Sequence, residues 1–85
     1  MTTIKDTRLI PASLIVQVVK EIDRGINEWG DVDKDLPTLM IGITEELGEV
    51  AHAINHESGV EQVQQEIAET IGILVRLYDM VENGA

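Results

Sequence analysis

Two short acidic stretches, EELGE at residues 45–49 and EIAE at residues 66–69, are the features around which this chain is organised. Both lie in segments whose apolar residues recur every three or four positions, which is the spacing of an amphipathic helix. Carboxylates three positions apart lie on one face of a helix. Glu46 and Glu49 therefore point in the same direction, and so do Glu66 and Glu69. Helix faces that are expected to pack therefore carry acid, an arrangement that suits a divalent cation.

The first acidic stretch lies in a helix predicted from Pro37 to about His56. Proline is favoured in a first helical turn, where its missing N–H costs nothing, and Asp35 or Thr38 is the predicted cap. The apolar residues that form its predicted packed face are Leu39, Ile43, Leu47, Val50 and Ile54.

The second acidic stretch lies in a helix that Ser58 and Glu61 are predicted to open as a capping box and that Asn83 and Gly84 end. Its predicted apolar face consists of Val60, Val63, Ile67, Ile71, Leu74, Tyr78 and Val81. Only a few residues near 57–59 separate the two helices, which predicts an antiparallel hairpin. Two residues, one on each helix, then lie side by side when their numbers sum to about 117. The midpoints of the two acidic pairs are offset along the hairpin axis by roughly 3 Å.

A further helix of about 18 residues is predicted to follow Pro11, and Gly30 is well placed to end it. Its apolar residues are Ile15, Val18, Ile22, Ile26 and Trp29. Residues 1–10 are expected to form a flexible arm. No segment has the alternating pattern of a strand, so residues 1–85 are predicted to form a single all-α domain of three helices.

The charge balance limits the partners of the chain. Sixteen acidic residues outweigh six basic ones, and the formal net charge is −10. Such a surface repels phosphate polymers and anionic membranes, so we expect neither as a partner. The sequence has no cysteine, which excludes disulfides and thiolate zinc sites. It shows neither a signal peptide nor a membrane-spanning run, and a cytoplasmic location is expected.

Several residues indicate that other surfaces come close to the helices. Gly42, Gly48 and Gly72 fall inside predicted helices, where each costs up to about 1 kcal/mol relative to alanine. Glycine at such positions suggests the close approach of another backbone or of a ligand. The segment 71–75 is apolar on every face, and three helices of one small chain would not cover it. We therefore expect an oligomer.

The acidic pairs themselves favour a magnesium site. Hard divalent cations take oxygen ligands, and magnesium often shares the phosphates of a substrate. Four or five carboxylates on two helices suit one or two such ions, which would position a triphosphate and a water for attack on phosphorus. A solvated acidic face is the ordinary alternative, since glutamate is a common helix former. Two level pairs together with Glu45 favour the site.

Two other patterns are weaker. His52 and His56 are spaced to hold zinc, but the HExxH context is absent, and surface histidines are the preferred interpretation. The acidic run at 31–35 begins like a calcium loop. It fails as one because Leu36 and Gly42 stand where glycine and glutamate are required.

The stretch 45–49, followed by the glutamates at the ends of 66–69, resembles the EExxE…ExxD signature of the MazG-like all-α nucleoside triphosphate pyrophosphohydrolases. Glu69 stands where the family has aspartate. The resemblance implies an enzyme that uses Mg²⁺, or Mn²⁺, to hydrolyse a (d)NTP to the (d)NMP and pyrophosphate. It also implies a homodimer or homotetramer built from helical hairpins.

The resemblance also implies roles for individual residues. Those matched to the metal ligands are Glu46, Glu49, Glu66 and Glu69. Glu45 would be an outer ligand, and Glu45, Glu46 and Glu49 are the candidates for catalytic carboxylates. Asn27 and Trp29 are candidates for selecting the substrate, although Trp29 ends an apolar face and a core position is the preferred interpretation for it. The spacing of Arg76, seven positions beyond Glu69 and on the same helix face, makes it a candidate for binding a phosphate, and a salt bridge is the preferred alternative.

A second interpretation stays open. The chain would then be a catalytically weak nucleotide-binding module, or a helical interaction module, that keeps the same fold. Glu69 in place of aspartate favours this alternative.

Overall fold

The computed structural model describes residues 9–29 and 35–84, apart from the side chains of Glu28 and Trp29. The described ranges contain three helices: α1 (Ala12–Trp29), α2 (Leu36–Asn55) and α3 (Val60–Glu82). No residue of these ranges lies in a strand, so the predicted all-α class with three helices is confirmed. Most of the predicted arm, residues 1–8, lies outside the described residues, and so does the run 30–34.

The beginnings of α1 and α2 follow the predicted signals. The carbonyl of Pro11 accepts the backbone N–H groups of Leu14 and Ile15, so the first turn of α1 forms at this proline. At the start of α2, Oδ1 of Asp35 accepts the backbone N–H of Thr38 at 2.8 Å. Asp35 is therefore the cap, because its carboxylate satisfies a donor that a helix leaves unpaired.

The predicted capping box of Ser58 and Glu61 is wrong. α3 begins after Gly59, which has a φ of +99° and no side-chain cap. Ser58 instead completes the end of α2, where its N–H bonds to the carbonyl of Ala53 at 3.0 Å and Glu57 turns with a φ of 50°. A left-handed residue after the last turn, followed by such a bond, is the Schellman ending of a helix. In a connection this short, Ser58 serves the end of α2 and not the start of α3.

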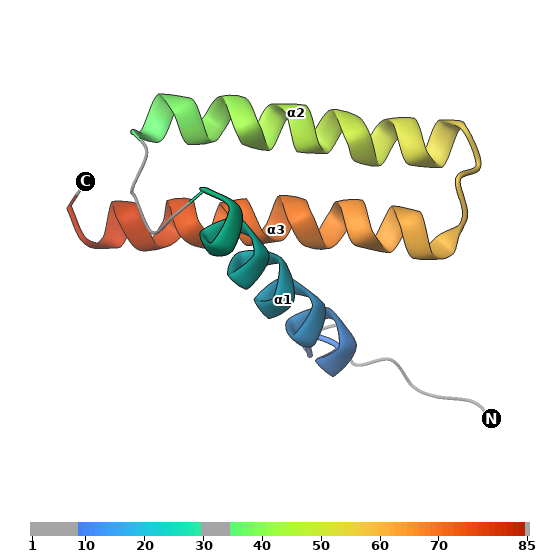
Figure 1. Cartoon of the computed structure of the whole chain (residues 1–85), viewed down its shortest axis with the longest axis horizontal. Helices are drawn as coiled ribbons and strands as arrows, with labels where there is room; N and C mark the ends of the chain where they lie inside the picture. The colour runs from blue at the N-terminus through green and yellow to red at the C-terminus, as the bar shows by residue number, and fades with distance from the viewer. Residues whose placement is uncertain (1–8, 30–34, 85) are drawn as a thin grey trace.

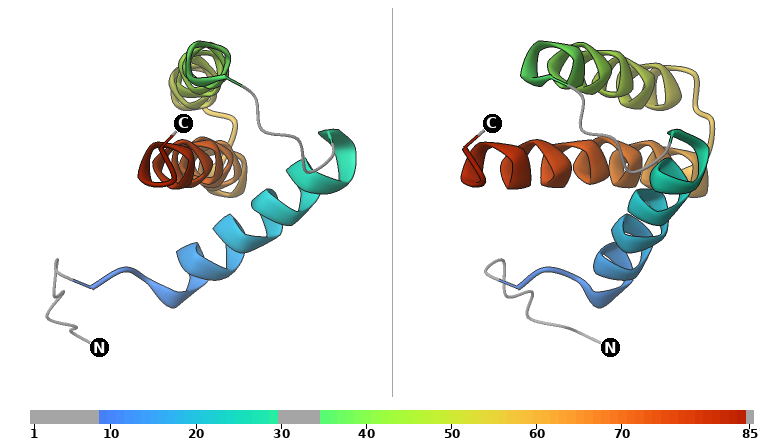
Figure 2. Two further views of the ribbon diagram at one scale, coloured as in Figure 1. Left: turned by 90° about the vertical axis from the view of Figure 1, so that its left-hand side faces the viewer. Right: turned by 60° about the vertical axis from the view of Figure 1, so that its left-hand side comes forward.

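α3 packs against both other helices, along the length of α2 and across α1. α2 and α3 lie side by side over most of their length, and the connection at residues 56–59 joins them at one end (Figure 1). α1 crosses α3 obliquely instead of lying along it, as two turned views show (Figure 2). The buried apolar side chains are few and come from all three helices: Val18, Leu39, Ile43, Ala53, Ala68 and Met80.

Gly72 lies where α1 crosses α3. A Cβ at this position would be 3.6 Å from Cγ1 of Ile22 and 3.7 Å from Cβ of Glu21. The predicted approach of another helix is therefore confirmed at Gly72. At Gly42 and Gly48, a Cβ would meet nothing within 4 Å in the part of the chain that the structure describes.

The packed face of α2 is rotated from the predicted one. Its buried residues are Leu39, Ile43 and Ala53. Leu47 and Ile54 were expected in this face but are 59% and 56% exposed, so that part of the prediction is wrong. Because a helix turns about 100° per residue, burying Ala53 instead of Ile54 also turns Glu46, instead of Leu47, toward α3. An acid thus occupies a packing position.

The predicted face of α3 is also partly wrong. Four of its residues are exposed in the described chain: Val60, Leu74, Tyr78 and Val81. The buried residues of α3 are instead three small ones, Ala68, Thr70 and Gly72, and Met80. Within the described ranges, no helix is sufficiently long and apolar to cross a bilayer.

Candidate metal centre

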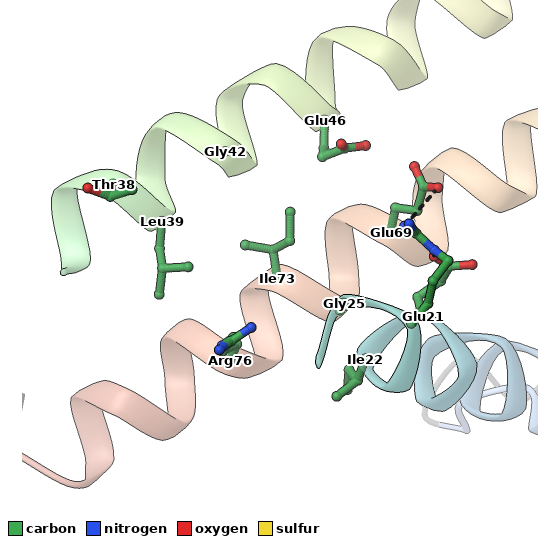
Figure 3. A pocket seen from close by; sticks show the side chains of 12 residues that line it. Glu21, Ile22, Gly25, Thr38, Leu39, Gly42, Glu46, Glu69, Ile73 and Arg76 are labelled. Carbon is green, nitrogen blue, oxygen red and sulfur yellow. Dashed lines mark hydrogen bonds and ion pairs between the residues drawn. The ribbon is translucent and has the colours of Figure 1, made fainter. Parts of the chain in front are cut away.

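Three glutamates from two helices converge between α2 and α3. Glu46 of α2, Glu66 and Glu69 of α3 each offer a carboxylate oxygen, and these oxygens lie within 4.8 Å of one another. Glu66 and Glu69 share a face of α3 because they are three positions apart, and Glu46 reaches them from the packed face of α2. Figure 3 shows the side chains of Glu46 and Glu69 facing each other across the space between the two helices.

The cluster holds its charges at high electrostatic cost. The pKa of Glu46 is raised from 4.5 to about 7, and the largest cause is burial, which penalises the charged form. A hydrogen bond to Glu69 and the negative charges of Glu69, Glu66 and Glu49 act in the same direction. The pKa of Glu66 is raised as well, first by burial and then by Glu69, against a hydrogen bond that Gln62 donates at 2.7 Å. These are the shifts expected of like charges gathered in a partly dry site.

One oxygen of the cluster is buried without a protein donor in the described part of the chain. Oε2 of Glu46 is buried and has no hydrogen-bond partner among the residues that the structure describes. A buried carboxylate oxygen without a donor is costly, so in native proteins it is normally paired with a donor or a cation. All three converging ligands are carboxylate oxygens, which Mg²⁺ and Mn²⁺ prefer. The residues present therefore fit a hard divalent cation.

The other two predicted acids lie near the cluster but outside it. Glu49 is exposed and does not belong to the converging group, although its charge contributes to the raised pKa of Glu46 and of Glu66. Glu45 is exposed and also lies outside the group. The structure thus brings together three of the four predicted metal ligands. The ligand role of Glu49 and the catalytic role of Glu45 stay predictions.

A pocket of about 210 Å³ adjoins the cluster and is lined by all three helices. Arg76, a predicted phosphate-binding residue, is part of its wall, together with Glu46 and Glu69. The apolar part of the wall includes Leu39 and Ile73, which extend into the space between α2 and α3 (Figure 3). The lining also includes Ile22, Gly25, Thr38, Gly42 and Gly72.

Of the other two predicted substrate residues, only Asn27 can be placed relative to this pocket. Asn27 is exposed and is not among the lining residues. Trp29 ends α1, and its side chain lies outside the described residues, so its predicted role is untested.

The sequence analysis missed the contacts that Glu21 and Arg24 of α1 make beside the cluster. Nε of Arg24 donates to Oε1 of Glu21 at 2.8 Å, and a terminal nitrogen of Arg24 lies 3.4 Å from Oε1 of Glu69. Gln65 of α3 donates to Glu21 at 2.5 Å and to Glu69 at 3.2 Å, and it accepts a bond from Gln17 at 3.3 Å. A Glu-x-x-Arg pair beside the apolar face of α1 was visible in the sequence. Its contact with Glu69 depends on how α1 crosses α3.

The histidine pair is separate from this centre. The rings of His52 and His56 stack with centroids 4.0 Å apart, and Nδ1 of His56 lies 3.0 Å from the carbonyl of His52. Both side chains are exposed near the end of α2, as expected of surface histidines.

No protein-family model matches this chain, and comparison with curated proteins and with solved structures also gave no match. What the site can do is therefore inferred from its own residues.

Proposed function

We propose that this protein is a magnesium-dependent nucleoside triphosphate pyrophosphohydrolase that converts a (d)NTP into the (d)NMP and pyrophosphate. The observation that carries the proposal is the buried, unpartnered oxygen of Glu46, which lies within a cluster of three carboxylates from two helices. An acidic face that only improves solubility has no reason to turn Glu46 inward. Mg²⁺ or Mn²⁺ would be held by Glu46, Glu66 and Glu69, with Glu49 as the predicted fourth ligand.

The adjoining pocket supports a nucleotide as the substrate. Arg24 and Arg76 line it and provide guanidinium groups, which suit phosphate oxygens, while Leu39 and Ile73 provide apolar surface. The formal net charge of −10 disfavours nucleic-acid polymers and anionic membranes as partners. It does not disfavour a nucleotide that arrives as its magnesium complex.

The reaction that we propose is a single displacement. The oxygen of a water forms a bond to the α-phosphorus, the bond from that phosphorus to the α,β-bridging oxygen breaks, and pyrophosphate leaves. A carboxylate of the cluster takes the proton of the water, and Glu45, beside the converging group, is our candidate for this base. Glu46, Glu66 and Glu69 would hold a divalent cation, which would neutralise charge that develops on the phosphoryl oxygens. Arg76 orients the phosphates.

The proposal includes an oligomer. Side chains exposed on α2 and α3 include Met40, Ile41, Leu47, Ile54, Leu74, Val75, Tyr78 and Val81. A chain of this size that leaves so many apolar side chains uncovered is better stabilised when a second copy covers them. The pocket of about 210 Å³ is also smaller than the roughly 300–1,000 Å³ of typical small-molecule sites. A homodimer or homotetramer of antiparallel α2–α3 hairpins would cover the exposed apolar side chains and would enlarge the pocket.

One observation favours a second candidate function. Oε1 of Glu69 already accepts bonds from Arg24 and Gln65, so part of the ligand capacity of this side chain is taken up. Together with the extra methylene of Glu69 relative to aspartate, this supports a catalytically weak module that binds a nucleotide or a helical partner.

A pyrophosphate-release assay with the full set of NTPs and dNTPs in Mg²⁺ tests the proposal. We expect equal amounts of nucleoside monophosphate and pyrophosphate from at least one substrate, and no products in EDTA. Glu66→Gln should lose at least about a hundredfold in kcat/KM, because an uncharged amide is a poor ligand for a hard cation. The matched control is Glu61→Gln, which removes one exposed charge from the same helix outside the cluster.

Melting curves separate the two candidate functions. Magnesium that binds only the folded state raises the melting temperature, by an amount equivalent to about 2.7 kcal/mol at a concentration of 100 Kd. Glu66→Gln should abolish this rise, and Glu61→Gln should keep it. Stabilisation by magnesium without any turnover would favour the weak binding module. Equal stabilisation by magnesium and by sodium at matched ionic strength would rule out the metal site.

A further inference from the structure

His52 and His56 form a pair of adjacent imidazoles near the end of α2. They are four positions apart, a spacing that places two side chains on one face of a helix, one turn apart. Their rings stack with centroids 4.0 Å apart and planes inclined by 23°, and both side chains are exposed. The two rings therefore lie side by side and open to solvent, where an ion has access to both.

A hydrogen bond to the backbone determines which nitrogen of His56 carries a proton. Nδ1 of His56 lies 3.0 Å from the carbonyl oxygen of His52. A carbonyl oxygen only accepts hydrogen bonds, so Nδ1 must be the donor, and the neutral ring has its lone pair on Nε2. A histidine that binds a metal usually donates its other ring N–H in this manner, which fixes the ring and makes it a better ligand. His56 is thus oriented as a ligand before an ion arrives.

The end of α2 is also a favourable place for positive charge. α2 ends at Asn55, and the last carbonyl groups of a helix carry a partial negative charge. The exposed carboxylates of Glu49 and Glu57 are close to the pair in sequence, and the formal net charge of the chain is −10. A negative surface of this kind raises the local concentration of cations. The surroundings therefore stabilise a cation that the two imidazoles bind.

The donor atoms distinguish this pair from the carboxylate cluster. Imidazole nitrogen suits transition metals such as Zn²⁺, Ni²⁺ and Cu²⁺, whereas Mg²⁺ takes oxygen ligands. In the described part of the chain, the only group of three or more candidate ligands that converges is the carboxylate cluster. The histidine pair therefore provides two protein ligands and leaves the other positions of an ion to water.

We propose that His52 and His56 form a second metal site, which binds Zn²⁺ or a transition-metal ion of similar preference. Nε2 of His56 is one ligand and a ring nitrogen of His52 is the other. The carbonyl of His52 holds the ring of His56 in place, and waters complete the tetrahedral coordination. The inference does not depend on the proposed function. It gives the chain a nitrogen site for a softer cation, apart from the oxygen site for a hard one.

Calorimetry with zinc chloride tests the site. The titrations are run in a large excess of Mg²⁺, which occupies oxygen ligands but competes poorly for nitrogen. His52→Gln and His56→Gln each remove one imidazole and keep a polar side chain. Glu57→Gln, which removes a neighbouring exposed charge, and Glu66→Gln, which removes a carboxylate of the cluster, are the controls. Circular dichroism shows that each variant folds.

The wild type should bind one Zn²⁺ per chain at this pair. His52→Gln and His56→Gln should each weaken the binding by at least about tenfold, because losing a partner of a ligand already costs that much. Glu57→Gln should weaken it by less than about fivefold, since exposed charges interact weakly. Glu66→Gln should leave the affinity for Zn²⁺ within about twofold of the wild type, since an exposed charge outside the site has little effect.

Nitrogen NMR of the imidazoles in the wild type tests the geometry without any substitution. Before zinc is added, His56 should be the tautomer with its proton on Nδ1. Zinc should shift the Nε2 resonance of His56 and a ring-nitrogen resonance of His52, and Nδ1 of His56 should keep its proton. Coordination through Nδ1 of His56 would contradict the proposed site.

Three calorimetric results would overturn the inference. Zinc binding that both histidine variants retain would place the ion elsewhere. Zinc binding that Glu66→Gln abolishes would place it among the carboxylates. An equal loss in Glu57→Gln and in the histidine variants would mean a diffuse attraction to the negative surface. None of these results bears on the release of pyrophosphate in Mg²⁺, so the proposed function is tested separately.

Discussion

At the scale of single residues, Glu46 is the side chain on which the site depends. It is the one member of the acidic cluster that α2 contributes, and it stands where an apolar residue would ordinarily pack against α3. Burial and three neighbouring glutamates raise its pKa to about 7. Such a shift is frequent at functional sites, because folding places a charge where water does not solvate it.

This shift predicts how the stability of the metal-free protein depends on pH. The pKa of Glu46 is about 7 in the folded chain and 4.5 in the reference state, so the folded state holds the proton more tightly. Its contribution to the free energy of unfolding is fully present below pH 4.5 and is lost as the pH rises through about 7. Urea denaturation in EDTA at several pH values from about 4 to 8 measures this loss.

The variant Glu46→Gln isolates the effect. Glutamine keeps the size of the side chain but does not titrate, so the difference in unfolding free energy between variant and wild type should grow in favour of the variant as the pH rises. Saturating Mg²⁺ should remove the advantage, because the wild type then has a partner for its charge. Parallel curves for the two proteins would mean that Glu46 is not strained in the folded state.

At the scale of elements, the crossing of α1 over α3 positions Glu21 and Arg24 beside the cluster. Gly72 sits at this crossing, and a Cβ there would make ordinary contacts of 3.6 Å and 3.7 Å with Ile22 and Glu21. The crossing therefore has room for a methyl group but not for a larger side chain.

Two substitutions at Gly72 test the crossing. Gly72→Ala should stabilise the chain by about 0.5–1 kcal/mol, because alanine is the better helix former and its Cβ fits. Gly72→Leu should destabilise it by about 1–3 kcal/mol, because the added atoms push α1 away from α3. Chemical denaturation measures both. A loss of stability in Gly72→Ala would show that the helices are closer than these distances indicate.

At the scale of the whole molecule, exposed apolar side chains and a strong negative charge act in opposite directions. Leu47 and Ile54 on α2, and Tyr78 and Val81 on α3, are each more than half exposed. Burying an apolar side chain contributes roughly 1.5–3 kcal/mol, so a few of them offset the repulsion between two chains of net charge −10 when salt is present.

We therefore expect a dimer or a larger oligomer in solution. Light scattering at micromolar concentration should give a mass at least twice that of one chain, rising or constant as salt is added. Leu47→Ser should shift the mass toward the monomer, since Leu47 is 59% exposed and its loss leaves the core of one chain intact. Val16→Ser on α1, where the side chain is 54% exposed, is the matched control. A monomer mass for the wild type would refute the oligomer.

Local rules determined much of this protein from its sequence. Helix-period spacing, Pro37 with its cap Asp35, and the ending at Asn83 and Gly84 all depend on neighbours within one turn, and the structure follows them. The spacing of Glu66 and Glu69 is equally local. These features could be predicted because the interactions that produce them lie within a few residues of the chain.

Tertiary structure alone decided which acids meet. Leu47 and Glu46 are adjacent in sequence, and the helical period allows either residue to face α3. Which of them does so depends on which other residues of α2 pack against α3. The arrival of Arg24 at Glu69 depends on the angle at which α1 crosses α3, which Gly72 permits but does not encode. Contacts between residues 45 positions apart are set by the packing of whole helices and not by local preference.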